Sequence, residues 1–323
     1  MPKRPLVVNS LIRVPRLGRH VKRAHDAWLE RRCEQYWASQ NSPARRRFQE
    51  HLPALNLVQQ RILTDWDRRG VAYATFDELI GDPGLWSEAD DLLREWAQGD
   101  VVREKERAYV AGGFRTGVFK EYLVKLYGYD EHRVLPWSSP LLRLGVHARL
   151  LDVVNSYLRM HAILRYIDAW YTVPLAEERS LTGSQCWHRD PEDVKIAKVF
   201  LYFSDVTREA GALEYLPHSR RGERFGDLWP HRVPSGSRPP TEQVTALVAP
   251  GDIECCAQPR GTFVFVDTAG LHRGGLARTQ ARLFACWEFV SPAAPFPRSF
   301  IPGKSPNPLA VPAALRDALP GWR

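Results

Sequence analysis

The pattern of hydrophobic and polar residues changes near residue 160. Before that point apolar residues recur every three or four positions, which is the spacing of one face of a helix. After it the apolar segments are short, rich in Val, Phe, Tyr and Trp, and bounded by Gly, Pro and Asp. We therefore expect a mainly helical first half followed by a β-rich second half.

The first half contains several helix-start signals. The mixture of charged and aromatic residues over 20–38 predicts a first helix. N-cap residues and prolines predict four further starts: Ser42-Pro43, Pro53 with an end at Gly70, Ser87 in the capping-box pattern Ser87-x-x-Asp90, and Ser139-Pro140 with an end at Leu158. We expect the apolar stripes of these helices to pack in the core.

The second half contains seven candidate strands. They cover 163–173, 184–188, 197–203, 212–216, 245–248, 262–266 and 282–290. Their regular spacing predicts an antiparallel sandwich or barrel of the jelly-roll kind. The segment 217–243, rich in Pro, Gly, Ser and Arg, interrupts them and is predicted to be a long loop over one end of the barrel.

These patterns divide the chain into four parts. We expect a basic helical arm over 1–50, a helical segment that packs on the barrel over 51–160, and the β core over 161–290. The remainder, 291–323, holds 8 of the 25 prolines, so it is predicted to wrap the surface and to end in a short helix near 312–318.

The net charge of the chain, +8, is concentrated at the N-terminus. Residues 1–50 hold 12 Lys/Arg and 4 Asp/Glu, which is a net of +8, while the other 273 residues hold 33 of each sign. A basic protein often binds nucleic acid or an anionic membrane. Because the β core is electrically balanced, nucleic acid is not the partner we expect for the core.

The five cysteines do not form a disulfide framework or a zinc motif. Their number is odd, no CxxC occurs, and Cys255 and Cys256 are adjacent. Free thiols are typical of a reducing compartment, and no run approaches 18 apolar residues. We expect a cytoplasmic protein without a membrane span.

The segment Gln185–Asp190 carries the main candidate chemistry. His188 and Asp190 are two positions apart, so in an extended strand their side chains lie on one side. His272, after the apolar strand 262–266 and a turn, is the best third partner. Two imidazoles and one carboxylate form the facial triad that holds Fe(II) in non-haem oxygenases. A His-x-Asp alone is a weak signal, so other residues must support it.

Arg282 supports this interpretation. It opens the apolar strand 282–290, where a buried guanidinium requires an anionic partner. A small dicarboxylate would fit, because a guanidinium binds a carboxylate with two charge-assisted hydrogen bonds. Arg273 and Arg278 are rivals, but both flank a glycine-rich turn where solvated arginines are common.

Together these segments resemble the phytanoyl-CoA dioxygenase family of the Fe(II)/2-oxoglutarate-dependent oxygenases. The resemblance covers about 140–290 and rests on the segments Trp187–Asp190, Lys198–Val206, Gly211–Ser219 and Pro250–Asp252, and on His272 and Arg282. It implies a mainly β, double-stranded β-helix core of the jelly-roll, cupin-like type with N-terminal and flanking helices.

The resemblance also implies an enzyme and its cofactors. His188, Asp190 and His272 would bind Fe(2+), and Arg282 would bind the far carboxylate of 2-oxoglutarate. With O2 the enzyme would hydroxylate an unactivated C–H bond and release succinate and CO2. Lys198 lies where relatives often contact the co-substrate, although a solvent-facing lysine at a strand edge is an equally good interpretation. The carboxylate Asp190 disfavours halogenation, because related halogenases lack that ligand.

One position departs from the family pattern. His218 stands where the family usually has a turn glycine, so we expect the turn there to differ. The substrate is predicted to be a small molecule, with an anionic or thioester-linked one favoured by the excess of arginine in 217–243. Two alternatives remain open: an oxygenase of this type acting on nucleic acid, and a non-catalytic β-sandwich that binds a sugar or a metal.

Overall fold

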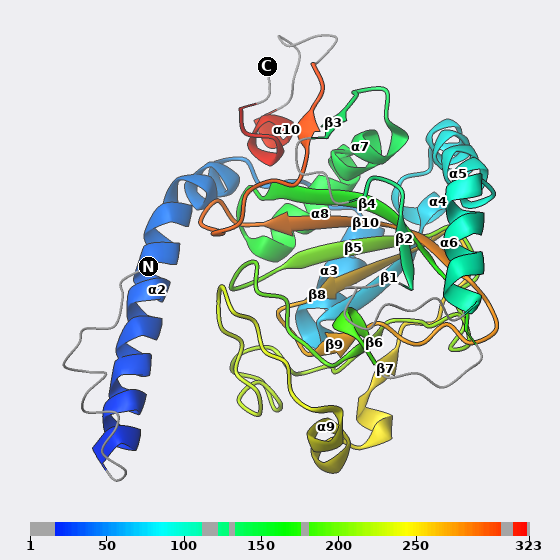
Figure 1. Ribbon diagram of the computed structural model, residues 1–323. Helices are drawn as coiled ribbons and strands as arrows, with labels where there is room; N and C mark the ends of the chain where they lie inside the picture. The colour runs from blue at the N-terminus through cyan, green and yellow to red at the C-terminus, as the bar shows by residue number, and fades with distance from the viewer. Residues whose placement is uncertain (1–16, 112–121, 129–132, 176–180, 305–312, 322–323) are drawn as a thin grey trace. The chain divides into compact units, whose positions relative to one another are not determined.

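The computed structural model describes residues 17–111, 122–128, 133–175, 181–304 and 313–321 (Figure 1). Side chains are described from residue 31 onward within this range. The chain divides into two compact units, Met1–Pro43 and Ala44–Arg323. In the described ranges no helix is long and apolar enough to cross a membrane.

The second unit is built on a six-stranded antiparallel sheet. Its order is β1 (Val71–Thr75), β8 (Thr262–Asp267), β5 (Ala197–Tyr202), β10 (Arg282–Val290), β4 (Ile163–Thr172) and β2 (Leu123–Lys125). β8 is buried along its whole length, so both of its faces pack against protein. Its even-numbered valines, Val264 and Val266, lie in the core between the two sheets. Phe263 and Phe265 alternate with them and therefore face the opposite side.

A smaller sheet contributes to the same core. Its order is β7 (Glu254–Cys255), β6 (Glu214–Tyr215) and β9 (His272–Arg273). From β5 to β10 the chain passes from the large sheet to the small one, back for β8, across for β9 and back for β10. This alternation between two antiparallel sheets is a jelly roll, so the predicted fold class is confirmed. A separate parallel pair joins β3 (Val134–Leu135) and β11 (Ile301–Pro302).

Helices cover the outer face of the large sheet. α3 (Leu57–Arg69) packs on β1 and β8, and α8 (Ala148–Leu158) packs on α3 and β5, as Figure 1 shows behind the sheet. Trp66 of α3 stacks on Tyr157 of α8 with ring centroids 3.8 Å apart, and it contacts Phe265 of β8 at 5.2 Å. These aromatic contacts fix the helical layer to the sheet.

The chain forms further helices. Their bounds are α2 (Leu17–Glu50), α4 (Phe76–Leu79), α5 (Pro83–Ala97), α6 (Asp100–Val110), α7 (Pro140–Gly145), α9 (Thr241–Leu247) and α10 (Ala313–Ala318), with 3₁₀ turns at Gly183–Gln185 and Pro250–Asp252. The helices that we expect to end at Gly70 and to lie near 312–318 are present.

Several sequence-based predictions are wrong. α2 continues through Pro43, which therefore does not begin a new helix. α5 begins after the cap Asp82 with Pro83 in its first turn, rather than at Ser87. The helix from Pro140 ends at Gly145, and α8 starts separately three residues later. The mainly helical first half also supplies β1 and β2 to the large sheet.

Two strand predictions also fail. Residues 184–188 form a 3₁₀ turn and an isolated bridge at His188, because this segment pairs only briefly with β9. The apolar run 245–248 belongs largely to helix α9, where Val244 and Val248, four positions apart, pack on Trp187 and Leu216. Helical spacing thus explains a run that in isolation resembles a strand.

Candidate metal centre

The two sheets hold His188, Asp190 and His272 at one place. His188 and His272 exchange backbone hydrogen bonds of 2.9 Å in both directions, which aligns the segment after the 3₁₀ turn with β9. The amide of Asp190 donates to the carbonyl of Thr268, also at 2.9 Å. Backbone pairing therefore sets the three side chains in register before any ligand binds.

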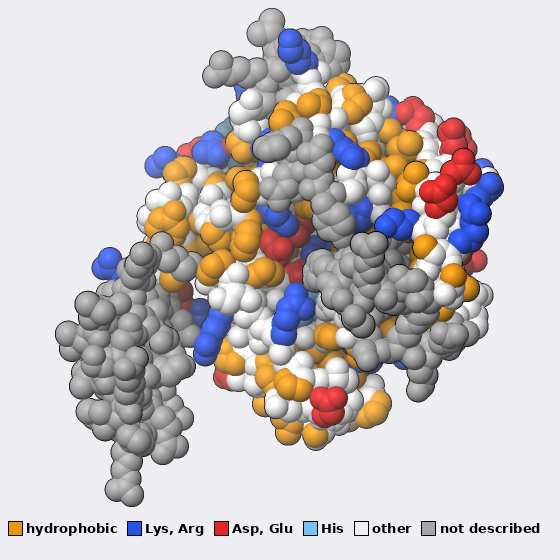
Figure 2. Space-filling model, in the orientation of Figure 1, with side chains coloured by type: hydrophobic (Ala, Val, Ile, Leu, Met, Phe, Trp, Pro, Cys, Tyr) orange, Lys and Arg blue, Asp and Glu red, His pale blue; other side chains and the backbone are white. Residues whose placement is uncertain are grey.

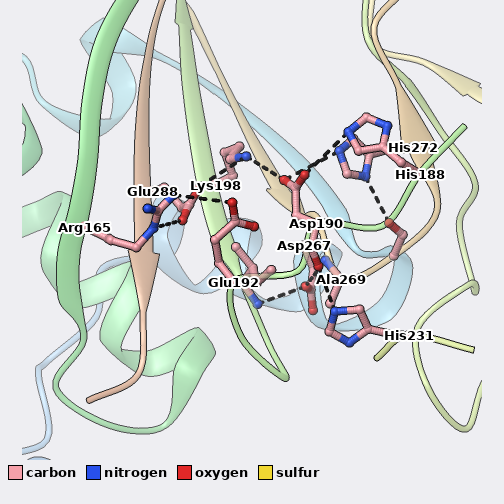
Figure 3. A network of polar contacts seen from close by, with 12 residues as sticks. Arg165, His188, Asp190, Glu192, Lys198, His231, Asp267, Ala269, His272 and Glu288 are labelled. Atoms are coloured by element: carbon pink, nitrogen blue, oxygen red, sulfur yellow. Dashed lines mark hydrogen bonds and ion pairs between the residues drawn. The ribbon is translucent and has the colours of Figure 1, made fainter. Parts of the chain in front are cut away.

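The ligand atoms of these residues converge. His188 Nε2 lies 3.4 Å from Asp190 Oδ1, and His272 Nε2 lies 3.7 Å from Asp190 Oδ2 (Figure 3). One donor atom from each residue falls within 4.8 Å of the others. All three residues are buried. This spacing lets three side chains bind one ion from one side.

Backbone carbonyls fix the orientation of both imidazoles. His188 Nδ1 lies 2.8 Å from the carbonyl of Cys186, and His272 Nδ1 lies 3.0 Å from that of Gly270. A carbonyl only accepts, so in each ring Nδ1 carries the hydrogen and Nε2 presents its lone pair. These contacts are typical of histidines that bind a metal through Nε2.

The charges at this place favour a cation. Burial would raise the pKa of Asp190, but the positive charge of Lys198 beside it holds that pKa well below its usual range. Burial, together with His188, lowers the pKa of His272 to about 3. A neutral His272 beside an ionised Asp190 is the donor set that a divalent metal requires.

The turn before His272 is held by Asp267. Its carboxylate accepts hydrogen bonds from Tyr157 Oη at 2.6 Å and from the amides of Ala269 and Ile196 at 3.1 and 3.2 Å. Ser219 Oγ in turn accepts from the amide of Leu271 at 2.7 Å. The position of His272 therefore depends on side chains that no local motif identifies.

Lys198 faces inward rather than solvent. Its Nζ lies 2.5 Å from Asp190 Oδ2 and 3.3 Å from a carboxylate oxygen of Glu288, its neighbour across β5 and β10 (Figure 3). Arg165 binds the other oxygen of Glu288 and lies 3.4 Å from Glu192. Asp190, Glu192 and Glu288 form a second carboxylate group. Lys198 and Arg165 pair with its members, and burial beside Glu288 raises the pKa of Glu192 to about 8, so we assign no metal there.

Arg282 lies in the same cavity as the three candidate ligands. This cavity has a volume of about 70 Å³ and is also lined by Lys198, Tyr122 and Ser184. Arg282 is 6% exposed, and its guanidinium lies 4.6 Å from the ring centroid of Phe284. Within the described part of the chain it forms no ion pair, and its Nε has no hydrogen-bond partner. A buried cation in this state is suited to an anionic ligand.

The hydroxyl groups beside Arg282 were not predicted from the sequence. Tyr122 Oη and Ser184 Oγ lie 2.8 Å apart on the cavity wall. The rival Arg273 is paired with Glu214 at 2.6 Å, so the structure separates it from Arg282. Tyr122 precedes an edge strand and Ser184 lies in a 3₁₀ turn, and no spacing in the sequence relates the two.

Arg189 was also missed. It lies between the two ligands of the His-x-Asp segment and is 2% exposed. Its guanidinium donates to four backbone carbonyls, those of Trp229 at 2.6 Å, Ala269 at 2.8 Å, Phe225 at 3.4 Å and Ser219. This single side chain ties the loop 217–243 to the turn before His272.

The loop 217–243 is therefore fastened to the candidate metal centre. His231 Nε2 donates to the carbonyl of Asp190 at 2.8 Å, and the amide of Arg189 donates to that of Ser237 at 2.9 Å. Arg220 is ion-paired with Glu223 and also donates to the carbonyl of Trp66. The arginines of this loop, which the sequence suggested for substrate binding, are thus partly used to hold the loop itself.

His218 has a backbone φ of 58°. This is the left-handed conformation in which glycine is favoured, so a histidine here adopts the conformation that a glycine would supply. The expected difference of this turn from that of the family stays a prediction. His218 is exposed, so nothing in its burial assigns it a catalytic part.

The comparisons with known proteins give structural similarity only. The sequence matches no family model and no curated protein sequence. Similar solved structures include EctD from S. alaskensis with 2-oxoglutarate and 5-hydroxyectoine, at 19% identity and a TM-score of 0.46, covering 74% of this chain and 79% of that one. HygX from Streptomyces hygroscopicus with nickel, 2-oxoglutarate and hygromycin B has 16% identity, a TM-score of 0.45, and coverages of 73% and 87%.

A third similar structure is the non-haem α-ketoglutarate-dependent epimerase SnoN from nogalamycin biosynthesis. It is 16% identical, with a TM-score of 0.44 over 72% of this chain and 83% of that chain. Similarity at this level carries no conclusion about reaction or substrate. The resemblance to the phytanoyl-CoA dioxygenase family stays a prediction, and the functional argument rests on the residues of this chain.

Proposed function

We propose that the protein is an Fe(II)- and 2-oxoglutarate-dependent oxygenase that hydroxylates a small molecule. One observation carries the proposal: two histidines and one carboxylate with converging donor atoms share a cavity with a buried arginine that has no carboxylate partner among the described residues. A metal site explains the triad, and a dicarboxylate co-substrate explains the arginine.

The donor set fits iron. His188 Nε2, His272 Nε2 and one oxygen of Asp190 provide two nitrogens and one oxygen, the facial set typical of non-haem Fe(II) oxygenases. In the Fe(II) enzymes this set leaves coordination positions open for co-substrate and O2. The chemistry supplied by bound iron and 2-oxoglutarate is oxidation of a C–H bond by O2, with succinate and CO2 as co-products.

The residues of this chain have three tasks in the proposal. His188, Asp190 and His272 hold the metal. Arg282, with the nearby hydroxyls of Tyr122 and Ser184, binds the far carboxylate of 2-oxoglutarate. Lys198 orients Asp190 and balances its charge through the contact at 2.5 Å. This is a positioning role, and it differs from the direct contact with the co-substrate that the sequence suggested.

Anaerobic reconstitution tests the proposal. Protein purified without oxygen is given Fe(II), 2-oxoglutarate and then O2, and succinate is measured with and without candidate substrates. Wild type should form succinate, and His188→Ala and Asp190→Ala should lose at least 100-fold of this activity. His51→Gln, an exposed histidine, is the matched control and should keep full activity.

A second variant tests the co-substrate site separately. Arg282→Gln should raise the concentration of 2-oxoglutarate needed for half-maximal succinate formation by roughly 10- to 100-fold, since a hydrogen bond to a charged group contributes about 1.5–3 kcal/mol. It should still bind Fe(II). Equal succinate formation by wild type and His188→Ala would rule out the proposed function.

A further inference from the structure

A second cavity lies on the concave face of the large sheet next to the candidate metal centre. It has a volume of about 160 Å³, and its lining includes Lys125, Arg133, Arg165, Tyr166 and Asp168. Figure 2 shows acidic and basic side chains gathered in the middle of this face, over β4, β10 and β5. Charged side chains therefore line both cavities, together with apolar ones such as Leu135, Ile167 and Phe300 in the second cavity.

Shared contacts join this cavity to the metal centre. Trp170, which lines the metal cavity, donates through Nε1 to Tyr166 Oη at 2.9 Å, and Tyr166 lines the second cavity. Lys125 Nζ lies 5.3 Å from the ring centroids of both. A ligand in the second cavity would therefore lie one aromatic ring away from the metal cavity.

A chain of ion pairs joins Arg165, which lines the second cavity, to Asp190 in the metal cavity. Arg165 pairs with Glu288, Glu288 with Lys198 at 3.3 Å, and Lys198 with Asp190 at 2.5 Å. These side chains are at most 14% exposed. The two cavities are therefore connected by ion pairs as well as by aromatic side chains.

The cations of the second cavity differ in how they are paired. Arg165 is neutralised by Glu288 and Glu192, and Lys125 lies 4.0 Å from Asp168. Arg133 forms no ion pair within the described ranges. Its Nη1 donates to the carbonyl of Leu126 at 3.4 Å, and its guanidinium lies 5.0 Å from the ring of Tyr127. The cavity lining thus holds three cations and a single carboxylate, Asp168.

We propose that this cavity binds the anionic group, a carboxylate or a phosphate, of a small polar substrate through Arg133 and Lys125. This inference rests on the proposed oxygenase function for its biological meaning. It replaces the loop arginines as the basis for an anionic substrate. A guanidinium beside an ammonium group binds both carboxylate and phosphate oxygens, so the two anions need separate tests.

Binding of simple anions to the metal-free full-length protein tests the site without turnover. Inorganic phosphate, acetate and octanoate are titrated by calorimetry into wild type, Arg133→Gln, Lys125→Met and Arg282→Gln. Arg133→Gln should weaken phosphate or acetate binding at this site at least tenfold, whereas Arg282→Gln should remove only the part of the binding that belongs to the co-substrate site. The stronger of phosphate and acetate identifies the anionic group. Arg224→Gln, an exposed arginine paired with Asp252, is the matched control.

The outcomes separate the two proposals. If Arg133→Gln unfolds, Arg133→Lys should retain binding within about threefold and Lys125→Met should still weaken it. Two results would overturn the inference. One is octanoate binding that is stronger than acetate binding and unchanged in Arg133→Gln, and the other is phosphate binding of equal strength in all variants. Succinate formation without Arg133-dependent binding would reject only this subsite. Arg133-dependent binding without succinate would reject only the oxygenase.

Discussion

At the scale of single residues, Asp190 has two competing cationic partners. Lys198 neutralises it at 2.5 Å, and Glu288 holds Lys198 in place at 3.3 Å. A divalent ion at the triad would supply positive charge on the other side of the same carboxylate. The importance of Lys198 should therefore depend on whether a metal is bound.

Lys198→Met should destabilise the metal-free protein by about 3–5 kcal/mol, the usual effect of removing one partner of a buried ion pair. The loss should be smaller with Co(II) bound, because the metal then compensates Asp190. Urea unfolding with and without Co(II) measures both values. Lys198→Met combined with Glu288→Gln should recover part of the loss. An equal loss in both states would argue against a metal at Asp190.

At the scale of elements, a β-bulge turns Arg165 toward the chain of ion pairs that joins the two cavities. In the pairing of β4 with β10, Tyr166 lies opposite Glu288 and Leu164 lies opposite Phe289. No residue of β10 therefore lies opposite Arg165 in this register. A bulge turns the side chain of one residue to the other side of the sheet, which allows the side chain of Arg165 to contact Glu288. Strict alternation would have placed this arginine on the helix-covered side, so the sequence alone does not place it at the site.

The loop 217–243 is another element whose role depends on one side chain. Arg189 satisfies carbonyls of Ser219, Phe225 and Trp229 in this loop. Arg189→Met would leave these buried acceptors unpaired, at about 1–3 kcal/mol each. We expect a clear loss of stability and faster tryptic cleavage within the loop, followed by mass spectrometry.

Two variants delimit this expectation. The stability and the cleavage rate of Arg189→Lys should lie between those of Arg189→Met and wild type, because an ammonium group keeps the charge but reaches fewer carbonyls. Arg238→Met is the matched control, since Arg238 makes one exposed contact, with the carbonyl of Gly183. Unchanged cleavage in Arg189→Met would mean that other contacts hold the loop.

At the scale of the whole molecule, the charge distribution separates the body from the N-terminal arm. The net charge of +8 belongs to residues 1–50, and the chemistry discussed above lies entirely within Ala44–Arg323. Any affinity for nucleic acid should therefore come from the arm. This bears on the alternative that the oxygenase acts on DNA or RNA.

Deletion of residues 1–43 should abolish salt-dependent binding to DNA and leave succinate formation within about twofold of wild type. The segment carries nine Lys/Arg against three Asp/Glu, so counterion release would give its binding a steep dependence on salt. Filter binding at two salt concentrations and the succinate assay measure the two effects. Retained DNA binding by the shortened protein would favour a nucleic-acid substrate.

The sequence by itself determined the long strands of the large sheet and the local segment that carries His188 and Asp190. The strands 163–173, 197–203, 262–266 and 282–290 were predictable because long runs of Val, Phe, Tyr and Trp have few other stable arrangements. The sequence predicted that His188 and Asp190 lie close together, because two residues that are two positions apart in an extended segment place their side chains on one side. The structures of two short segments were not predicted. Residues 71–75 form a strand because they pair with β8. Residues 245–248 belong largely to a helix because that helix packs on the cluster around Trp187.

Only the tertiary structure decided what surrounds the triad. The meeting of His188 with His272 depends on backbone pairing across 84 positions of the chain. The inward direction of Lys198, the carbonyl partners of Arg189 and the cavity at Arg133 depend on strand register, a bulge and loop packing. Side chains that a local pattern places as solvent-facing become buried there, because their charges find partners that are distant in the sequence and near in the fold.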